Sequence, residues 1–164
     1  MTTIEPLPRS SAITANLVLA ILLGGLAAGF FDIIFASVLS GVSPDRVFKY
    51  VAGGWVGLPA ARAGGTEMVV LGAASHFGLA WIYAAFFTLV SRAVPLLRRQ
   101  WIVFGLLYGA SLHVFMSFVV VPLSAIHRDP WATTFENFMI NLVGQALLFG
   151  LPIAFAARRY LGPN

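Results

Sequence analysis

Four separate apolar runs, each about 20 residues long and so able to cross the hydrocarbon core of a bilayer as a helix, occupy this chain of 164 residues. Only 10% of the residues are charged and 59% are hydrophobic, whereas about a quarter of the residues in a soluble domain are charged. The composition excludes a soluble globular protein. The sequence predicts an all-α integral membrane four-helix bundle.

The gaps between the runs define the domain organisation. The spans are predicted at about residues 13–39, 68–90, 101–123 and 135–157, and no gap is as long as an independent domain of about 50 residues. We therefore expect a single transmembrane domain over residues 1–164. A short interfacial helix is predicted over residues 43–53, because Ser43 and Pro44 suit a helix start and Gly53 and Gly54 suit its end.

The basic residues predict the orientation of the chain. Six of them lie on the side of the two termini and the second connection, and four lie on the opposite side. The two groups are Arg9, Arg92, Arg98, Arg99, Arg158 and Arg159 on the first side and Arg46, Lys49, Arg62 and Arg128 on the second. Since cytoplasmic loops carry the excess of Lys and Arg, both termini are predicted to be cytoplasmic. The net charge of +4 thus follows topology, and no nucleic-acid partner is expected.

Small residues recur at helical spacing within the runs. Glycine lets helix backbones approach closely in lipid, where dispersion and interhelical hydrogen bonds drive association. The glycines expected to pack helices together are Gly25, Gly29, Gly72, Gly105 and Gly109. The same seams suit contact with another chain, so a homo-oligomer or a partner membrane protein is expected in addition to the lipid bilayer.

Polar side chains within the runs form a second pattern. A rise of about 1.5 Å per residue places the carboxylate, histidines and amides about 9 to 15 Å below the outer ends of their helices. The polar layer comprises Asp32, His76, His113, Ser117, Asn141 and Gln145. A carboxylate facing lipid at this depth costs about 2.5 to 3.5 kcal/mol, so Asp32 is expected to face the interior with a histidine partner. Asp32 is either a functional group or a hydrogen-bonded tie between helices.

Three functions fit this layer. In the first, Asp32, His76 and His113 pass a proton or bind a small solute in a transport or conductance protein, because both group types titrate near physiological pH when perturbed. In the second, His76 and His113 ligate haem or a metal. In the third, the protein is an accessory or assembly subunit that docks another membrane protein through its glycines. We favour the first.

The chain lacks the motifs of the common enzyme classes. It contains no nucleophile elbow, no HExxH and no phosphate-cradling loop. With no cysteine, it also has no disulfide, thiolate metal site or cysteine nucleophile. We therefore expect no enzymatic activity and no cofactor, with haem or a metal as the minority alternative.

Four segments carry a family resemblance. They are AGFFDIIFASV, SPDRVFKYVAGGWVG, LYGASLHVFMSFVVVPLSA and GQALLFGLPIA, the last followed by Arg158 and Arg159. Over about residues 25–159, their order and spacing resemble those of small uncharacterised bacterial inner-membrane proteins near the YagU-like group. The resemblance implies a four-helix inner-membrane protein and assigns no activity. It highlights Asp32, Pro44, Gly54, His76, Tyr108, Gly109 and Pro122. The chain departs from such relatives at His113 and Ser117, where an aromatic residue and an amide are common, and this favours Asp32 with His76 over a two-histidine site.

Overall fold

The computed structural model describes residues 9–163, and every regular element in that range is a helix. Two spans are uninterrupted helices, α1 (Arg9–Ser40) and α4 (Thr66–Ala93). The third span consists of α6 (Trp101–Phe115), η1 (Met116–Val120) and α7 (Val121–Leu123), and the fourth of α8 (Phe135–Gln145), η3 (Ala146–Gly150) and α9 (Leu151–Leu161). The segments long and apolar enough to cross a membrane are Thr14–Ser40, Thr66–Ala93, Trp101–Leu123 and Phe135–Leu161. The predicted all-α chain with four such helices is confirmed.

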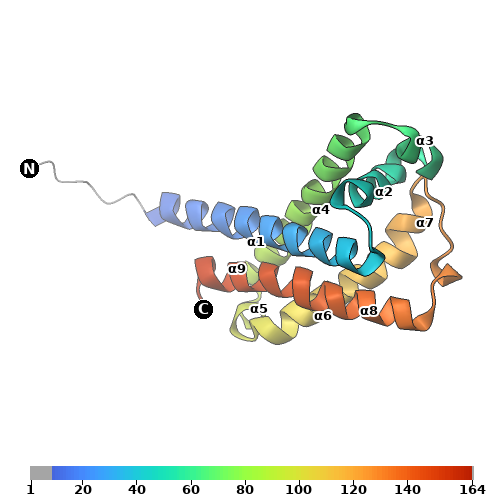
Figure 1. Ribbon diagram of the computed structural model, residues 1–164. Helices are drawn as coiled ribbons and strands as arrows, with labels where there is room; N and C mark the ends of the chain where they lie inside the picture. The colour runs from blue at the N-terminus through green and yellow to red at the C-terminus, as the bar shows by residue number, and fades with distance from the viewer. Residues whose placement is uncertain (1–8, 164) are drawn as a thin grey trace, which may run out of the picture.

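The two ends of the described chain lie at the same end of the bundle (Figure 1). α1 packs against α4 and α9, and α6 packs against α8, η3 and α9. This terminal end also holds α5 (Leu96–Arg99). The opposite end, which we call the α2 end, holds α2 (Pro44–Val56), α3 (Leu58–Ala63) and the connection 124–134, which contains the short 3-10 helix η2 (Pro130–Ala132). The backbone N–H of Ala125 donates to the Gly54 carbonyl at 2.9 Å and ties this connection to α2.

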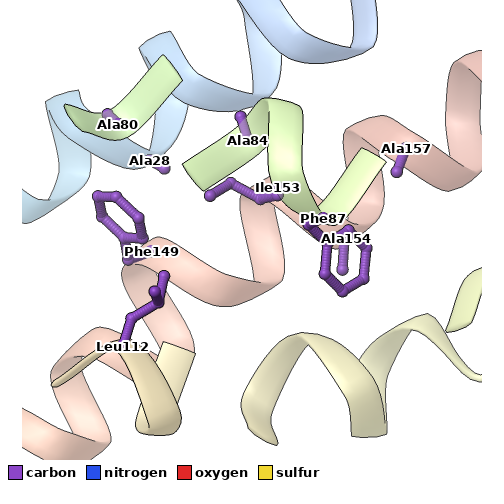
Figure 2. Packing of buried hydrophobic residues seen from close by; sticks show 9 residues of the cluster. All are labelled: Ala28, Ala80, Ala84, Phe87, Leu112, Phe149, Ile153, Ala154 and Ala157. Carbon is purple, nitrogen blue, oxygen red and sulfur yellow. The ribbon is translucent and has the colours of Figure 1, made fainter. Parts of the chain in front are cut away.

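A core of small and aromatic side chains joins the four spans (Figure 2). Its members are Ala28, Ala80, Ala84, Phe87, Leu112, Phe149, Ile153, Ala154 and Ala157. Five of these nine residues are alanine, which brings the helix backbones close together. Because lipid is as apolar as these side chains, close van der Waals contact holds the helices in place of burial from water.

The five packing glycines all face another helix of the same chain. A Cβ at Gly72 would collide with the backbone of Phe48 in α2, and one at Gly109 would collide with the Gln145 carbonyl at the end of α8. A Cβ at Gly105 would lie 2.9 Å from the Ala154 Cβ in α9. Gly25 and Gly29 receive two side chains of α4, Trp81 and Phe77. These seams are therefore filled within the chain and do not offer a groove to a second protein.

The third and fourth spans each contain one π-helical turn directly before a proline. η1 ends two residues before Pro122, and η3 ends two residues before Pro152. The sequence predicts only a kink at Pro152, from the lost hydrogen bond to the carbonyl of Leu148. A proline ring also clashes with the carbonyl four residues earlier, and the wider π turn gives that carbonyl room. The wide turn at Pro122 is not anticipated by the sequence analysis.

The connections contain more helix than the sequence indicates. α2 does not end at Gly53 and Gly54 but continues to Val56, and Gly57 ends it with a φ of 82°. This left-handed backbone favours glycine, whereas Gly53 is held inside the helix against the Leu58 side chain. α3 is not predicted, and α5 forms where only a turn is expected between the second and third spans.

Arginine side chains close the helix ends at the terminal end. Arg98 Nη1 donates to the carbonyls of Leu161 and Gly162 at 2.8 and 3.0 Å, and Arg158 Nη1 donates to the carbonyl of Arg99 at 3.1 Å. Arg98 is only 5% exposed. In the sequence these arginines indicate only the orientation of the chain, whereas in the structure they also cap helix ends.

Candidate functional site

Asp32 and His76 form one polar group, on the facing sides of α1 and α4. The Nε2 of His76 lies 2.9 Å from the Gly29 carbonyl, and because a carbonyl only accepts, this nitrogen carries the proton. The imidazole also packs edge-on against Phe77 and Phe48, with ring centroids 5.2 and 6.0 Å apart. Asp32, one turn after Gly29, interacts electrostatically with His76. We call this group the Asp32–His76 pair.

His113, Ser117 and Asn141 lie together in a different place. They line a cavity of about 160 Å³ between α6, η1, α8 and the connection 124–134, which we call the His113 cavity. The His113 ring packs against Phe138, with centroids 4.8 Å apart. Among residues 9–163, the buried His113 Nε2 has no hydrogen-bond partner. Asn141 Nδ2 donates to the Asn137 carbonyl at 2.7 Å.

A larger cleft of about 1070 Å³ adjoins the His113 cavity at the α2 end. The two spaces share lining residues from α2, the connection 124–134 and α8: Tyr50, Arg128, Thr133, Asn137 and Asn141. Neither space is lined by Asp32 or His76. The polar layer expected from the sequence is therefore divided into a closed pair and an open cavity.

Four basic side chains line the larger cleft, which we call the basic cleft. Arg46 and Lys49 come from α2, Arg62 from α3 and Arg128 from the connection 124–134. Lys49 Nζ donates to the Gly64 carbonyl at 2.7 Å. Within the described part of the chain, the guanidinium groups of Arg46, Arg62 and Arg128 form no ion pair or hydrogen bond.

One carboxylate, that of Asp45, lines the basic cleft. A hydrogen bond from the Ser43 hydroxyl holds the pKa of Asp45 below its ordinary value, with further contributions from a backbone N–H and from the charges of Lys49 and Arg46. The Asp45 carboxylate is therefore ionised at neutral pH. It offsets one of the four basic charges, and the lining of the cleft stays cationic.

Gln145 is placed apart from both groups. Its Oε1 is buried and has no hydrogen-bond partner among the described residues, and it lines neither the basic cleft nor the His113 cavity. The two histidines are also in separate surroundings, His76 against α1 and α2 and His113 against α8. Over residues 9–163, no group of three or more His, Cys, Asp or Glu side chains could hold a metal ion.

The basic cleft is not predicted from the sequence, although all four basic residues are used there to orient the chain. The spacing of Arg46 and Lys49 places them on one side of a helix, and this is the only local signal. Arg62 and Arg128 reach the cleft because the connections fold back over α2, and no periodic pattern records that folding.

No family model, curated protein or solved structure matches this chain. The four long apolar helices are compatible with an integral, multi-pass membrane protein in contact with lipid. The resemblance to the YagU-like group stays a prediction.

Proposed function

We propose that this chain is a small transport or conductance protein of a bacterial inner membrane, related to the YagU-like group, with both termini in the cytoplasm. In this proposal, a small solute enters from the periplasmic side through the basic cleft and proceeds to His113. The observation that carries the proposal is that the basic cleft and the His113 cavity share five lining residues. They thus adjoin along a polar route from the α2 end into the third and fourth spans.

The π-helical turn η1 supports this route. It carries Ser117, which lines the His113 cavity, and it begins three residues after His113. π turns interrupt the regular helix hydrogen-bond pattern and are frequent at functional sites. Together with η3 in the neighbouring span, η1 gives the two helices beside the cavity a place to bend during passage of a solute.

The proposal moves the functional site away from Asp32 and His76. The His76 ring is bonded to the Gly29 carbonyl and enclosed by Phe48 and Phe77, which suits a tie between helices. His113 has an unpartnered ring nitrogen beside a cavity, which suits contact with a solute.

The test is solute flux into vesicles reconstituted with the full chain, measured by stopped-flow light scattering with glycerol, potassium chloride, potassium phosphate and glycerol 3-phosphate. We expect faster flux of at least one solute than in protein-free vesicles. His113→Phe should reduce it by about tenfold, equivalent to about 1.4 kcal/mol of barrier. Leu107→Phe is the matched control, because Leu107 lies on the same helix, is 60% exposed and lines neither space. Flux equal to that of protein-free vesicles for all four solutes would contradict the proposal.

A second variant tests the placement of the site. Asp32→Asn replaces the carboxyl group of the Asp32–His76 pair and changes no residue that lines the basic cleft or the His113 cavity. We expect its flux to equal that of the wild type. Lost flux in Asp32→Asn together with unchanged flux in His113→Phe would return the site to the pair.

A further inference from the structure

The basic residues at the two ends of the bundle are used differently. At the terminal end, Arg98 and Arg158 donate hydrogen bonds to backbone carbonyls at helix ends. At the α2 end, the guanidinium groups of Arg46, Arg62 and Arg128 donate none within residues 9–163, yet all three line one cleft. Like charges gathered around a shared space repel one another, so this arrangement is stabilised when an anion occupies the space.

The remaining lining of the basic cleft indicates what kind of anion fits. Its volume of about 1070 Å³ lies just above the range of about 300 to 1,000 Å³ for pockets that hold small organic ligands. The amide side chains of Asn137 and Asn141 line it on one side, and apolar side chains including Leu39, Val42 and Val47 line it elsewhere. A bare inorganic ion would leave most of this surface without contact.

We propose that the basic cleft binds a phosphate-bearing small organic molecule, with the phosphate among Arg46, Arg62 and Arg128 and the organic part against the amide and apolar walls. Guanidinium groups match phosphate oxygens with paired N–H donors. A phosphate offers more acceptor oxygens and more charge than a single carboxylate, which suits three guanidiniums better. The inference deepens the proposed function by naming the class of solute. The same chemistry comes from a soluble organic phosphate or from a phospholipid headgroup.

The first experiment measures equilibrium binding to the full chain in phosphatidylcholine nanodiscs, by isothermal titration with glycerol 3-phosphate, inorganic phosphate and glycerol. We expect glycerol 3-phosphate to bind more tightly than inorganic phosphate, and glycerol not to bind. The double variant Arg46→Gln, Arg128→Gln should weaken binding of glycerol 3-phosphate by at least about tenfold. Asp45→Asn, which removes the carboxylate from the cleft, should tighten it.

The control is Arg159→Gln, which removes one positive charge from an exposed arginine at the terminal end and should bind as the wild type does. Arg46 and Arg128 are themselves exposed, so the double variant should keep the wild-type helix content by circular dichroism. Arg62→Gln alone provides a second, independent variant with the same expected direction.

A second arm identifies the source of the phosphate. The chain is placed in nanodiscs containing phosphatidylglycerol, and retained lipid is counted by native mass spectrometry for the wild type and the double variant. Retention of phosphatidylglycerol that is lost in the double variant, without binding of glycerol 3-phosphate, assigns the site to a headgroup. The inference is overturned if the wild type binds neither compound, or if the double variant binds both as well as the wild type does.

Binding and flux fail separately in these tests. Binding of the organic phosphate without flux of any solute contradicts the transport proposal and supports the binding site. Flux that is blocked by His113→Phe, with no binding in either arm, supports transport and contradicts the phosphate site.

Discussion

The Asp32–His76 pair and the His113 cavity each contain a histidine inside the same bundle, but the surroundings of the two histidines are opposite. The pair is closed, because the His76 ring is bonded to the Gly29 carbonyl and packed between aromatic rings. The cavity adjoins the basic cleft, and its histidine has an unpartnered nitrogen among the described residues. The distance between the surrounding backbones therefore decides whether a polar side chain in a membrane span bonds to a neighbouring helix or lines a cavity.

Glycine controls that approach around the pair. Gly29 accommodates the Phe77 ring of α4, and Gly72 accommodates the backbone of α2 at Phe48. Phe48 in turn covers the His76 ring. Around the cavity, the connection 124–134 runs over the helix ends and leaves a space of about 160 Å³. Substitutions that break the packing around the Asp32–His76 pair should therefore destabilise the bundle, whereas substitutions that fill the His113 cavity should stabilise it.

The largest effect is expected from Gly72→Ala, which separates α2 from α4. The new Cβ would overlap the Phe48 carbonyl and lie 2.9 Å from the Phe48 Cα. Backbone does not move aside as a side chain does, so we expect a loss of about 3 kcal/mol, at the upper end of overpacking costs. The free energy of unfolding in mixed micelles measures this loss.

Gly78→Ala is the control on the same helix. A Cβ there would meet nothing within 4 Å, and alanine is a better helix former, so stability should rise by about 0.5 to 1 kcal/mol. Equal effects of the two substitutions would show that α2 does not depend on contact with α4 at Gly72.

His76→Phe tests the closed pair at smaller magnitude. The substitution keeps an aromatic ring between Phe48 and Phe77 and removes the hydrogen bond to the Gly29 carbonyl. Interhelical hydrogen bonds in membrane proteins contribute about 0.6 kcal/mol on average and about 1.7 kcal/mol at most. The free energy of unfolding in mixed micelles should therefore fall by an amount within that range. A variant as stable as the wild type would show that the hydrogen bond from His76 to Gly29 does not stabilise the bundle.

Much of this comparison lies beyond the sequence. The spans are readable because length and apolarity alone determine them, and the sequence also names Asp32 and His76, which lie on the neighbouring helices α1 and α4. The partner of the His76 nitrogen is a backbone carbonyl, which carries no residue identity. The basic cleft depends on Arg62 and Arg128 being folded back over α2, through the turn at Gly57 and the bond from Ala125 to Gly54. Such long-range placements leave no periodic trace.

His113→Phe tests the open cavity, with a stability change of opposite sign. A buried polar atom without a partner costs about 1 to 3 kcal/mol, and removing the unpartnered Nε2 recovers part of it. The phenyl ring is larger than the imidazole and would crowd Phe138, whose ring centroid lies 4.8 Å from that of His113. We therefore expect a net gain of about 1 kcal/mol in the free energy of unfolding. A variant that is more stable yet has lost flux would mark His113 as a residue kept for function. A loss of stability equal to that of His76→Phe would instead indicate that both histidines serve to hold helices together.

The smallest effect concerns α2, which connects the two polar groups: Phe48 faces the pair, while Lys49 and Tyr50 line the cleft. Asp45, near the start of α2, has a pKa below its ordinary value of 3.8, chiefly through the Ser43 hydroxyl. A lowered folded-state pKa stabilises the helix above the unfolded pKa and loses that contribution as pH falls through the folded pKa.

Hydrogen exchange of the α2 amides, corrected for intrinsic rates, should therefore show less protection at pH 3 than at pH 6, pH values chosen to bracket the unfolded pKa of about 3.9. Asp45→Asn should show the lower protection at both pH values. α4 should not change beyond its first turn, which holds Glu67, a second carboxyl group that accepts a backbone hydrogen bond. The effect is small because Asp45 is exposed to solvent, where water weakens each of these interactions. Loss of protection along α4 as well would mean that α2 and the Asp32–His76 pair loosen together. The packing of the pair would then depend on α2, which also lines the basic cleft.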